Sequence, residues 1–184
     1  MKLDVIPPTR PPSSTPWYAG GLQFTCTQCG NCCTGGPGYV WISEEEVQRL
    51  AEFFKLSVPE VLRKYCRTIR GRISLKERRM PNGNYDCIFL KELTAETKSN
   101  DRQLEPGEPI PTTRYGCAIY PVRPLQCRTW PFWETNLSGR EMWDFAAGRC
   151  PGMNSGSRKF TREQIESLRN ATDWPEDPPT SSEK

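Results

Sequence analysis

Apolar residues recur at helical spacing in three segments of this chain, and two of the segments begin with a capping box. In a capping box, the side chains of two residues satisfy free N–H groups at the start of a helix. The chain has this pattern at Ser43 with Glu46 and at Thr161 with Gln164, the latter opening a predicted helix over Thr161–Asn170. The apolar stripes that follow are Val47, Leu50, Ala51 and Phe54 in the first helix, and Ile165 and Leu168 in the last.

The third helical segment lies between these two and follows Ser57. Pro59 falls in its first turn, where proline is well tolerated because the N–H groups of that turn have no partner within the helix. Val61, Leu62 and Tyr65 have the spacing of an inward face. Cys66 lies near the end of this predicted helix.

Short runs of β-branched and aromatic residues between turn residues predict strands. They are Tyr39–Ile42, Ile73–Lys76, Cys87–Leu90, Trp130–Thr135 and Glu141–Phe145, and we expect the last two to form a hairpin. Together the segments predict an α+β fold, a small loop-rich single domain with short strands and about three helices.

The composition indicates a small hydrophobic core. Only 35% of the residues are hydrophobic, and there are 18 prolines and 14 glycines. A bound metal commonly supplements a small core, since its binding free energy becomes folding free energy when the site exists only in the folded chain. We therefore expect a metal-stapled domain.

The ends of the chain and one internal segment are polar and rich in proline. We predict a disordered arm at residues 1–16, an ordered domain at 17–171 and a disordered tail at 172–184. Residues 91–113 are predicted to form a long surface loop within the domain.

Four cysteines fall within eight residues in the run Cys26–Cys33, which reads CTQCGNCC. Two residues between cysteines let neighbouring sulfur atoms converge on one centre, and Gly30 allows a tight turn that points N–H groups at sulfur. The chain has nine cysteines and no histidine. A metal site would therefore use thiolates, with or without a carboxylate, and catalysis by a histidine base is excluded.

The expected compartment is the cytoplasm. No apolar run is long enough for a signal peptide or a membrane span, so we expect no membrane partner. Thiols stay reduced in the cytoplasm, and an odd number of cysteines fits a disulfide framework, the alternative, poorly. The formal charge of +3 is too small and too evenly spread to indicate nucleic-acid binding.

Four of the other five cysteines lie beside turn residues or charged residues, and three arginines are close to them in sequence. Arg128 and Arg149 adjoin Cys127 and Cys150, and Arg123 precedes Cys127 by one helical turn. Positive charge stabilises thiolates, so these arginines are candidate contacts of a metal–sulfur centre. Ordinary solvated surface charges are the alternative.

The cysteine run and the motifs after it resemble the CxxCxxCC cysteine-cluster family (YkgJ-like). The motifs are Cys87-Ile88-Phe89-Leu90, Cys117-Ala118-Ile119-Tyr120, Arg123 to Phe132, and Cys150-Pro151-Gly152. That family is described as a zinc- or iron-chelating domain with eight shared cysteines. The resemblance implies that the ligands are Cys26, Cys29, Cys32, Cys33, Cys87, Cys117, Cys127 and Cys150, and it leaves Cys66 as a small buried apolar residue.

Eight thiolates divide naturally into two sites of four, and we expect the side chains of the adjacent Cys32 and Cys33 to diverge. CxxCxxC with a distant Cys-Pro, here Cys150-Pro151, is similar to the ligand set of a 4Fe–4S cluster. The spacing is also compatible with tetrahedral Zn²⁺. The cofactor is therefore an iron–sulfur cluster, which the spacing favours slightly, or zinc.

Three classes of function follow from this pattern. The first is an iron–sulfur redox protein, with Trp130, Phe132, Trp133 and Trp143 either surrounding the cluster or forming ordinary core. The second is a zinc-stabilised structural or interaction module with an unknown protein partner. The third is a protein-modifying enzyme, since similar clusters occur in a flagellin lysine methylase, although no methyl-donor loop is recognisable. The sequence identifies no nucleophile–base pair, so catalytic residues are unknown and enzymatic activity is undecided.

Overall fold

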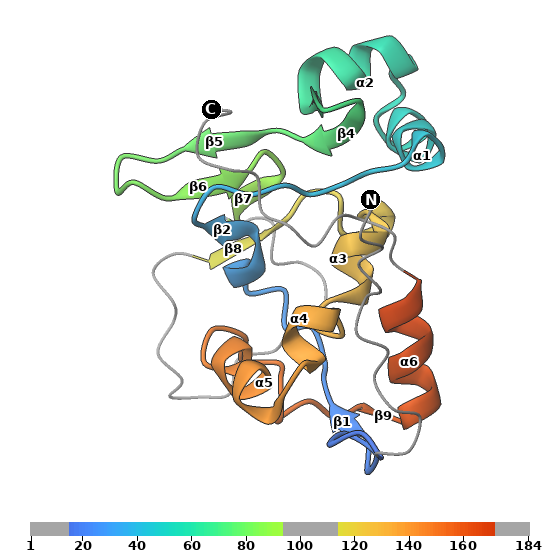
Figure 1. Ribbon diagram of the computed structural model, residues 1–184. Helices are drawn as coiled ribbons and strands as arrows, with labels where there is room; N and C mark the ends of the chain where they lie inside the picture. Colours follow the sequence, from blue (N-terminus) through green and yellow to red (C-terminus); the bar gives the residue numbers. More distant parts are fainter. Residues whose placement is uncertain (1–14, 94–113, 172–184) are drawn as a thin grey trace, which may run out of the picture.

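The computed structural model describes residues 15–93 and 114–171 (Figure 1). The predicted tail at 172–184 lies outside the described residues, as do most of the arm at 1–16 and most of the loop at 91–113. Helices and several small sheets are both present, which confirms the α+β class. None of the described helices is long and apolar enough to cross a membrane.

The three predicted helices are present: α1 (Glu44–Phe54), α2 (Val58–Tyr65) and α6 (Arg162–Asn170). Both capping boxes form, because the side chains of Ser43 and Thr161 accept from the backbone N–H of Glu46 and Gln164. Val47, Leu50 and Ala51 are buried on α1. These helices could be predicted from short-range sequence signals, because a cap and an apolar stripe involve only neighbouring residues.

The described residues contain more helices than the three predicted. The additional α-helices are α3 (Leu125–Thr129), α4 (Glu134–Leu137) and α5 (Arg140–Ala147), and short 3-10 helices are η1 (Asn31–Cys33) and η3 (Tyr120–Val122). The hairpin predicted at Trp130–Thr135 and Glu141–Phe145 is therefore wrong. Trp143 and Ala146, three residues apart, form the buried stripe of α5, so the aromatic residues that suggested strands serve helix packing instead.

Nine short strands form four small antiparallel sheets in the described part of the chain. The pairs are β1 (Leu22–Gln23) with β9 (Lys159–Phe160), β3 (Cys66–Ile69) with β4 (Arg72–Leu75), and β7 (Leu90–Leu93) with β8 (Arg114–Cys117). The three-stranded sheet has the order β2 (Thr34–Gly35), β6 (Tyr85–Cys87), β5 (Glu77–Arg79).

The predicted strands match this pattern only in part. β4 covers most of Ile73–Lys76, whereas Cys87–Leu90 spans the end of β6 and the start of β7. β7 also takes in residues 91–93, which the sequence predicts as the start of the surface loop. Tyr39–Ile42 makes only an isolated bridge to β4, between Trp41 and Ser74, with hydrogen bonds from Ile42 to Ile73 and from Leu75 to Val40. The Trp41 N–H donates to the Gln126 side chain at 2.7 Å instead of to a strand.

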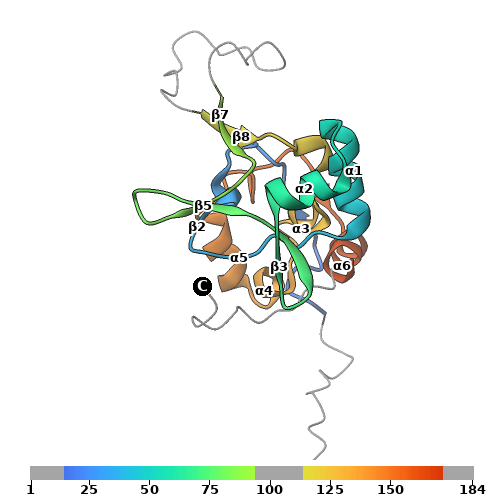
Figure 2. The same cartoon turned by 90° about the horizontal axis from the view of Figure 1, so that it is seen from above.

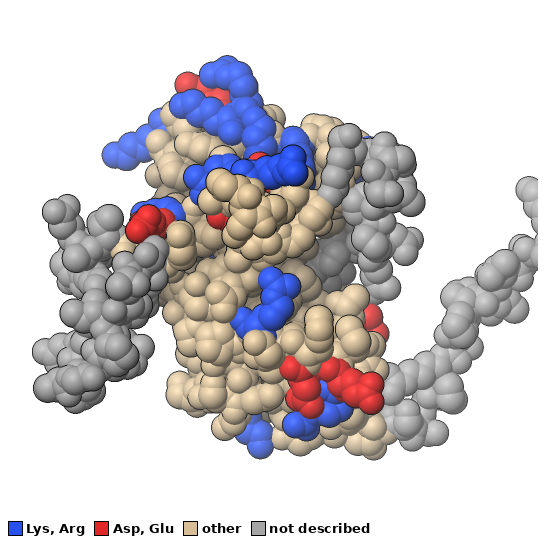
Figure 3. Space-filling view, turned by 90° about the vertical axis from the view of Figure 1, so that its left-hand side faces the viewer, with Lys and Arg blue, Asp and Glu red and all other residues tan. Residues whose placement is uncertain are grey.

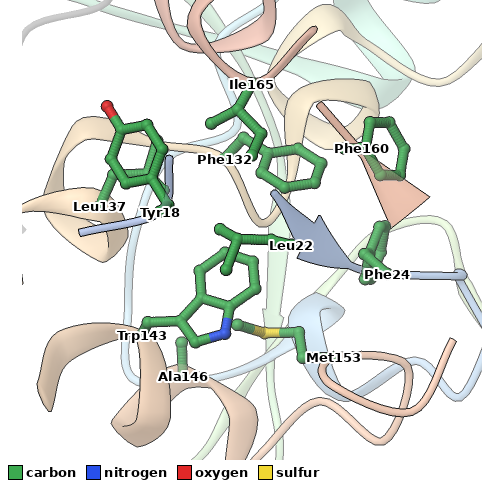
Figure 4. Packing of buried hydrophobic residues seen from close by; sticks show 10 residues of the cluster. All are labelled: Tyr18, Leu22, Phe24, Phe132, Leu137, Trp143, Ala146, Met153, Phe160 and Ile165. Carbon is green, nitrogen blue, oxygen red and sulfur yellow. The ribbon is translucent and has the colours of Figure 1, made fainter. Parts of the chain in front are cut away.

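Two hydrophobic clusters form the core, one at each end of the molecule. The first packs β1, β9, α4, α5 and α6 around Phe132 and Trp143, with Leu22 and Ile165 beside them (Figure 4). The second packs α1 and α2 against β3 and β4, and in Figures 1 and 2 these elements lie together. Cys150 packs against the first cluster, and Cys87 and Cys117 pack against the second. The cysteine-bearing segments therefore lie between the two clusters.

On one face of the molecule, basic side chains are most crowded at the upper end (Figure 3). Figure 3 shows Lys and Arg side chains at the upper end of one face, where α2 and β3 to β5 lie. Several of these side chains are held by the protein itself: Arg67 pairs with Glu77 at 2.8 Å, Arg72 lies over the Trp41 ring, and Arg78 donates to a backbone carbonyl.

Glu46 is a buried carboxylate that joins α1 to α3. Its side chain accepts hydrogen bonds from the backbone N–H of Ser43 at 3.1 Å and of Leu125 at 2.7 Å. It also pairs with Arg128 at 3.2 Å and with Arg49 at 3.3 Å. Because α3 carries Cys127, this carboxylate helps to fix the position of one predicted metal ligand.

We expect Glu46→Ala to lower the free energy of unfolding by about 2 kcal/mol, because it leaves the part-buried Leu125 N–H without its acceptor and Arg128 without its carboxylate. Urea unfolding followed by tryptophan fluorescence measures this change. Glu44→Ala, on an exposed position of the same helix turn, is the control and should cost less than about 1 kcal/mol. Equal losses in the two variants would contradict the role assigned to Glu46.

Candidate metal centre

The cysteine run forms a compact turn between β1 and β2. Gly30 has φ of 79°, in the left-handed region, and its carbonyl accepts from the Cys33 N–H at 2.8 Å. A Cβ atom at this position would lie 2.8 Å from Leu90 Cδ1, so glycine is needed for both conformation and space. The turn expected at Gly30 is therefore present, and it continues directly into η1.

Cys32 and Cys33 do not diverge, contrary to the sequence-based expectation. Their Sγ atoms are 3.9 Å apart. Both residues lie in η1, where the tight helical backbone replaces the extended chain in which neighbouring side chains point to opposite sides. The backbone conformation at Cys32 and Cys33 therefore brings their two sulfur atoms together.

Four remote cysteines come to this turn from four different elements. Cys87 and Cys117 end strands β6 and β8, Cys127 lies in α3, and Cys150 follows α5. Cys32 is close enough to raise the pKa of each of these four thiols electrostatically.

The two remaining cysteines of the run belong to the same group. Cys26 raises the pKa of Cys117, and Cys29 raises the pKa of Cys150. The structure thus gathers the eight cysteines of the predicted ligand set in one region, at the junction of the two hydrophobic clusters.

Cys66 lies apart from this group. It is buried in the second cluster, and burial raises its pKa to about 11. The charge that acts on it comes from Lys76, not from another thiol. Its position agrees with the expectation of a small buried apolar residue.

The thiols differ in how easily they ionise. The pKa of Cys32 falls to about 7, because its sulfur accepts a hydrogen bond from Cys33 and lies near Arg123 and Arg149. The same hydrogen bond raises the pKa of Cys33. Burial is the largest cause that raises the pKa of the four remote thiols, to about 11 for Cys87. Without added positive charge, most of these thiols therefore hold their protons at neutral pH.

Two of the three predicted arginines face the thiols, and the third does not. Arg123 lowers the pKa of Cys32, Cys117 and Cys127. Arg149 acts on Cys32 and donates to the Thr34 carbonyl at 3.0 Å. Arg128 instead pairs with Glu46.

Two further side chains support this region: Asn31, which the sequence did not single out, and Trp130, which the sequence indicated only as a member of an aromatic shell or core. Asn31 donates from its amide to the Arg149 carbonyl at 2.9 Å, which ties the cysteine run to the segment before Cys150. Trp130 Nε1 is buried without a regular hydrogen-bond partner, yet its N–H lies near enough to the Cys150 sulfur to lower the pKa of that thiol. An orphaned N–H aimed at sulfur suits a thiolate better than a thiol. Asn31, inside the cysteine run, was open to a sequence-based guess, whereas the role of Trp130 depends on tertiary packing.

Two cavities adjoin the thiols. One of about 180 Å³ is lined by Cys32, Cys33, Cys87 and Cys127, with Trp130 and Trp133. The other, of about 230 Å³, contains Cys32 and Cys150 in its wall. Across residues 15–93 and 114–171, however, no three Cys, Asp or Glu side chains are arranged to hold a metal ion. The thiols gather without closing around a single point.

Eight thiols match soft or borderline metals in chemistry. The fold and this site define a small α+β domain of the metal-chelating class. The chain belongs to the CxxCxxCC family, described as "Putative zinc- or iron-chelating domain", which matches residues 25–151.

One relative is an uncharacterized protein, MJ0661, of Methanocaldococcus jannaschii. It is 29% identical over 152 residues, which cover 79% of this chain and 66% of that protein. The chain therefore spans just under two thirds of the relative's length. No solved structure matches the chain.

Proposed function

We propose that the protein binds metal through the thiolates of Cys26, Cys29, Cys32, Cys33, Cys87, Cys117, Cys127 and Cys150. The observation that carries this proposal is that Cys32 interacts with Cys33 and with the four remote thiols, while Cys26 and Cys29 interact with Cys117 and Cys150. These cysteines come from segments as far apart as the loop after β1 and the end of α5. Chance burial of free thiols does not explain why Cys66 alone is kept apart.

The electrostatics of the site also support a bound cation. Burial and mutual repulsion oppose ionisation of the remote thiols, and Arg123 and Arg149 offset only part of that cost. A divalent metal supplies the missing positive charge and deprotonates the thiols that bind it. Metal binding would draw the sulfur atoms closer and join the two hydrophobic clusters.

The distance between Cys32 and Cys33 favours zinc as the metal. Two thiolates on one tetrahedral ion, each about 2.3 Å from the metal, lie about 3.8 Å apart. The Sγ atoms are 3.9 Å apart. In a 4Fe–4S cluster each cysteine binds a separate iron, so Cys32 and Cys33 could not both bind one cluster at this distance. We therefore place a zinc-stapled module before a 4Fe–4S redox protein, reversing the slight preference of the cysteine spacing.

An iron–sulfur redox protein is the second candidate, and the indole of Trp130 is the observation that favours it. Hydrogen bonds to cluster sulfur and an apolar shell tune reduction potential, and Trp130 and Trp133 line both cavities beside the thiols. Either centre requires reduced thiols, which agrees with the cytoplasmic setting that we infer.

Anaerobic purification followed by elemental analysis and a visible spectrum tests both candidates. We expect colourless protein that carries zinc and no acid-labile sulfide. Brown protein that carries iron and acid-labile sulfide would contradict the zinc candidate and support the iron–sulfur candidate. Protein that folds cooperatively with neither metal would refute metal binding, and a parallel aerobic preparation shows whether oxidation has removed a cluster.

A further inference from the structure

A groove of about 710 Å³ opens beside the cysteine site, between α6 and the segment from η3 to α3. Its volume lies within the range of about 300–1,000 Å³ that is usual for small-molecule sites. Arg123, Arg128 and Arg158 line it together with Tyr120, and Cys26 contributes to its wall. The metal site proposed above uses Cys26 and Arg123 of this lining, and most of the other lining residues have no role in it.

Two arginines of the lining are candidate contacts for an anion, although Arg123 also acts on the thiols and donates one N–H to the Tyr120 carbonyl at 2.9 Å. Arg123 lies over the Tyr120 ring, with Cζ 3.9 Å from the ring centroid, and Arg158 lies over the Phe160 ring at 4.3 Å. Within residues 15–93 and 114–171, neither guanidinium pairs with a carboxylate. Stacking covers one face of each guanidinium and leaves donor N–H groups for an anion.

The other charges of the groove leave a positive balance. Arg128 is already paired with Glu46. Glu163 is the acidic residue of the lining, and it lies in the first turn of α6, where its hydrogen bonds to Thr161 and to the helix backbone hold its charge. Arg123 and Arg158 therefore outweigh Glu163.

The rest of the lining is largely apolar. Phe24, Phe132 and Phe160 come from the first hydrophobic cluster, and Trp130 and Leu168 pack against it. A groove with an aromatic lining and arginines combines burial of an apolar group with recognition of a charged one. An inorganic anion would contact only the arginines and would leave the apolar lining unused.

We propose that this groove binds a small organic anion, a carboxylate or phosphate attached to an apolar body, with the anionic group at Arg123 and Arg158. Because Cys26 lies in the wall, the bound molecule would sit next to the thiol cluster. The binding itself depends on the groove and not on which metal the thiols hold.

Anilinonaphthalene sulfonate tests this proposal, because it joins an aromatic body to an anionic group and becomes fluorescent in apolar surroundings. We expect saturable binding to the purified protein, and about tenfold weaker binding by Arg158→Ala, which corresponds to the loss of one charge-assisted hydrogen bond. Arg162→Ala, which removes an exposed arginine outside the groove lining, is the control and should bind as the wild type does.

A second variant guards against a folding defect in Arg158→Ala. Ser167→Glu places a negative charge in the groove without disturbing the Arg158–Phe160 stack, and it should weaken binding by a similar factor. Wild-type protein that fails to bind the probe, or equal binding by Ser167→Glu and the wild type, would overturn the proposal. Metal content measured on the same samples separates this result from a failure of metal binding.

Discussion

Cys32→Ala should lose most of its bound metal and its cooperative unfolding transition together. Cys32 is the thiol that acts on all four remote cysteines, and its sulfur lies 3.9 Å from that of Cys33. Removing the Cys32 thiol therefore removes the ligand that interacts with most of the other predicted ligands. Metal content by elemental analysis, with thermal unfolding followed by near-ultraviolet circular dichroism, measures both losses.

Cys66→Ala is the matched control, since it removes a thiol that lies outside the cluster. We expect it to keep the wild-type metal content and to lose about 1 kcal/mol of stability, the cost of a small cavity. Equal metal loss in the two variants would mean that Cys66 is a ligand and that the division into eight and one is wrong.

Removal of the metal should unfold much of the domain. Structural zinc contributes about 10–16 kcal/mol in zinc-finger peptides at neutral pH, which equals or exceeds the whole stability of a typical domain. Here Cys150 belongs to one hydrophobic cluster, and Cys87 and Cys117 belong to the other, so the metal would join both. We expect excess EDTA with a phosphine reductant to abolish the near-ultraviolet signal, and added zinc to restore it.

EDTA already saturated with zinc serves as the control for effects of the chelator itself. If the metal-free protein keeps the thermal transition of the untreated protein, metal binding contributes nothing to the fold and the stapling role is wrong. An iron–sulfur centre would resist EDTA alone and require an oxidant in addition, which distinguishes the second candidate.

The helices that sequence patterns predicted are those with local signals. Ser43 with Glu46 and Thr161 with Gln164 form their capping boxes because the partners are neighbours on one helical turn. The hairpin predicted after Trp130 failed because aromatic residues favour strands only when a partner strand packs beside them. In this protein Asn136 donates to the Pro131 carbonyl, and Trp143 is buried on α5.

The sequence predicted which residues form the candidate site, but not how their side chains are placed relative to one another. Motif resemblance named the eight cysteines, but local reasoning held that neighbouring side chains diverge and so separated Cys32 from Cys33. The 3-10 turn of η1 reverses that outcome. Arg128 adjoins Cys127 in sequence and yet pairs with Glu46, while Arg123, which is more distant from Cys127 in sequence, acts on the thiols.

The sequence by itself determined the chemistry available to this protein, because thiol density, the absence of histidine and helix caps depend only on which residues are present and on their near neighbours. Only the tertiary structure decided which of these side chains lie close together. Four remote segments bring their cysteines to the cysteine run, the Trp130 N–H lies near the Cys150 sulfur, and Arg158 lines a groove. Such contacts depend on packing between segments far apart in the chain, and no local sequence pattern encodes them.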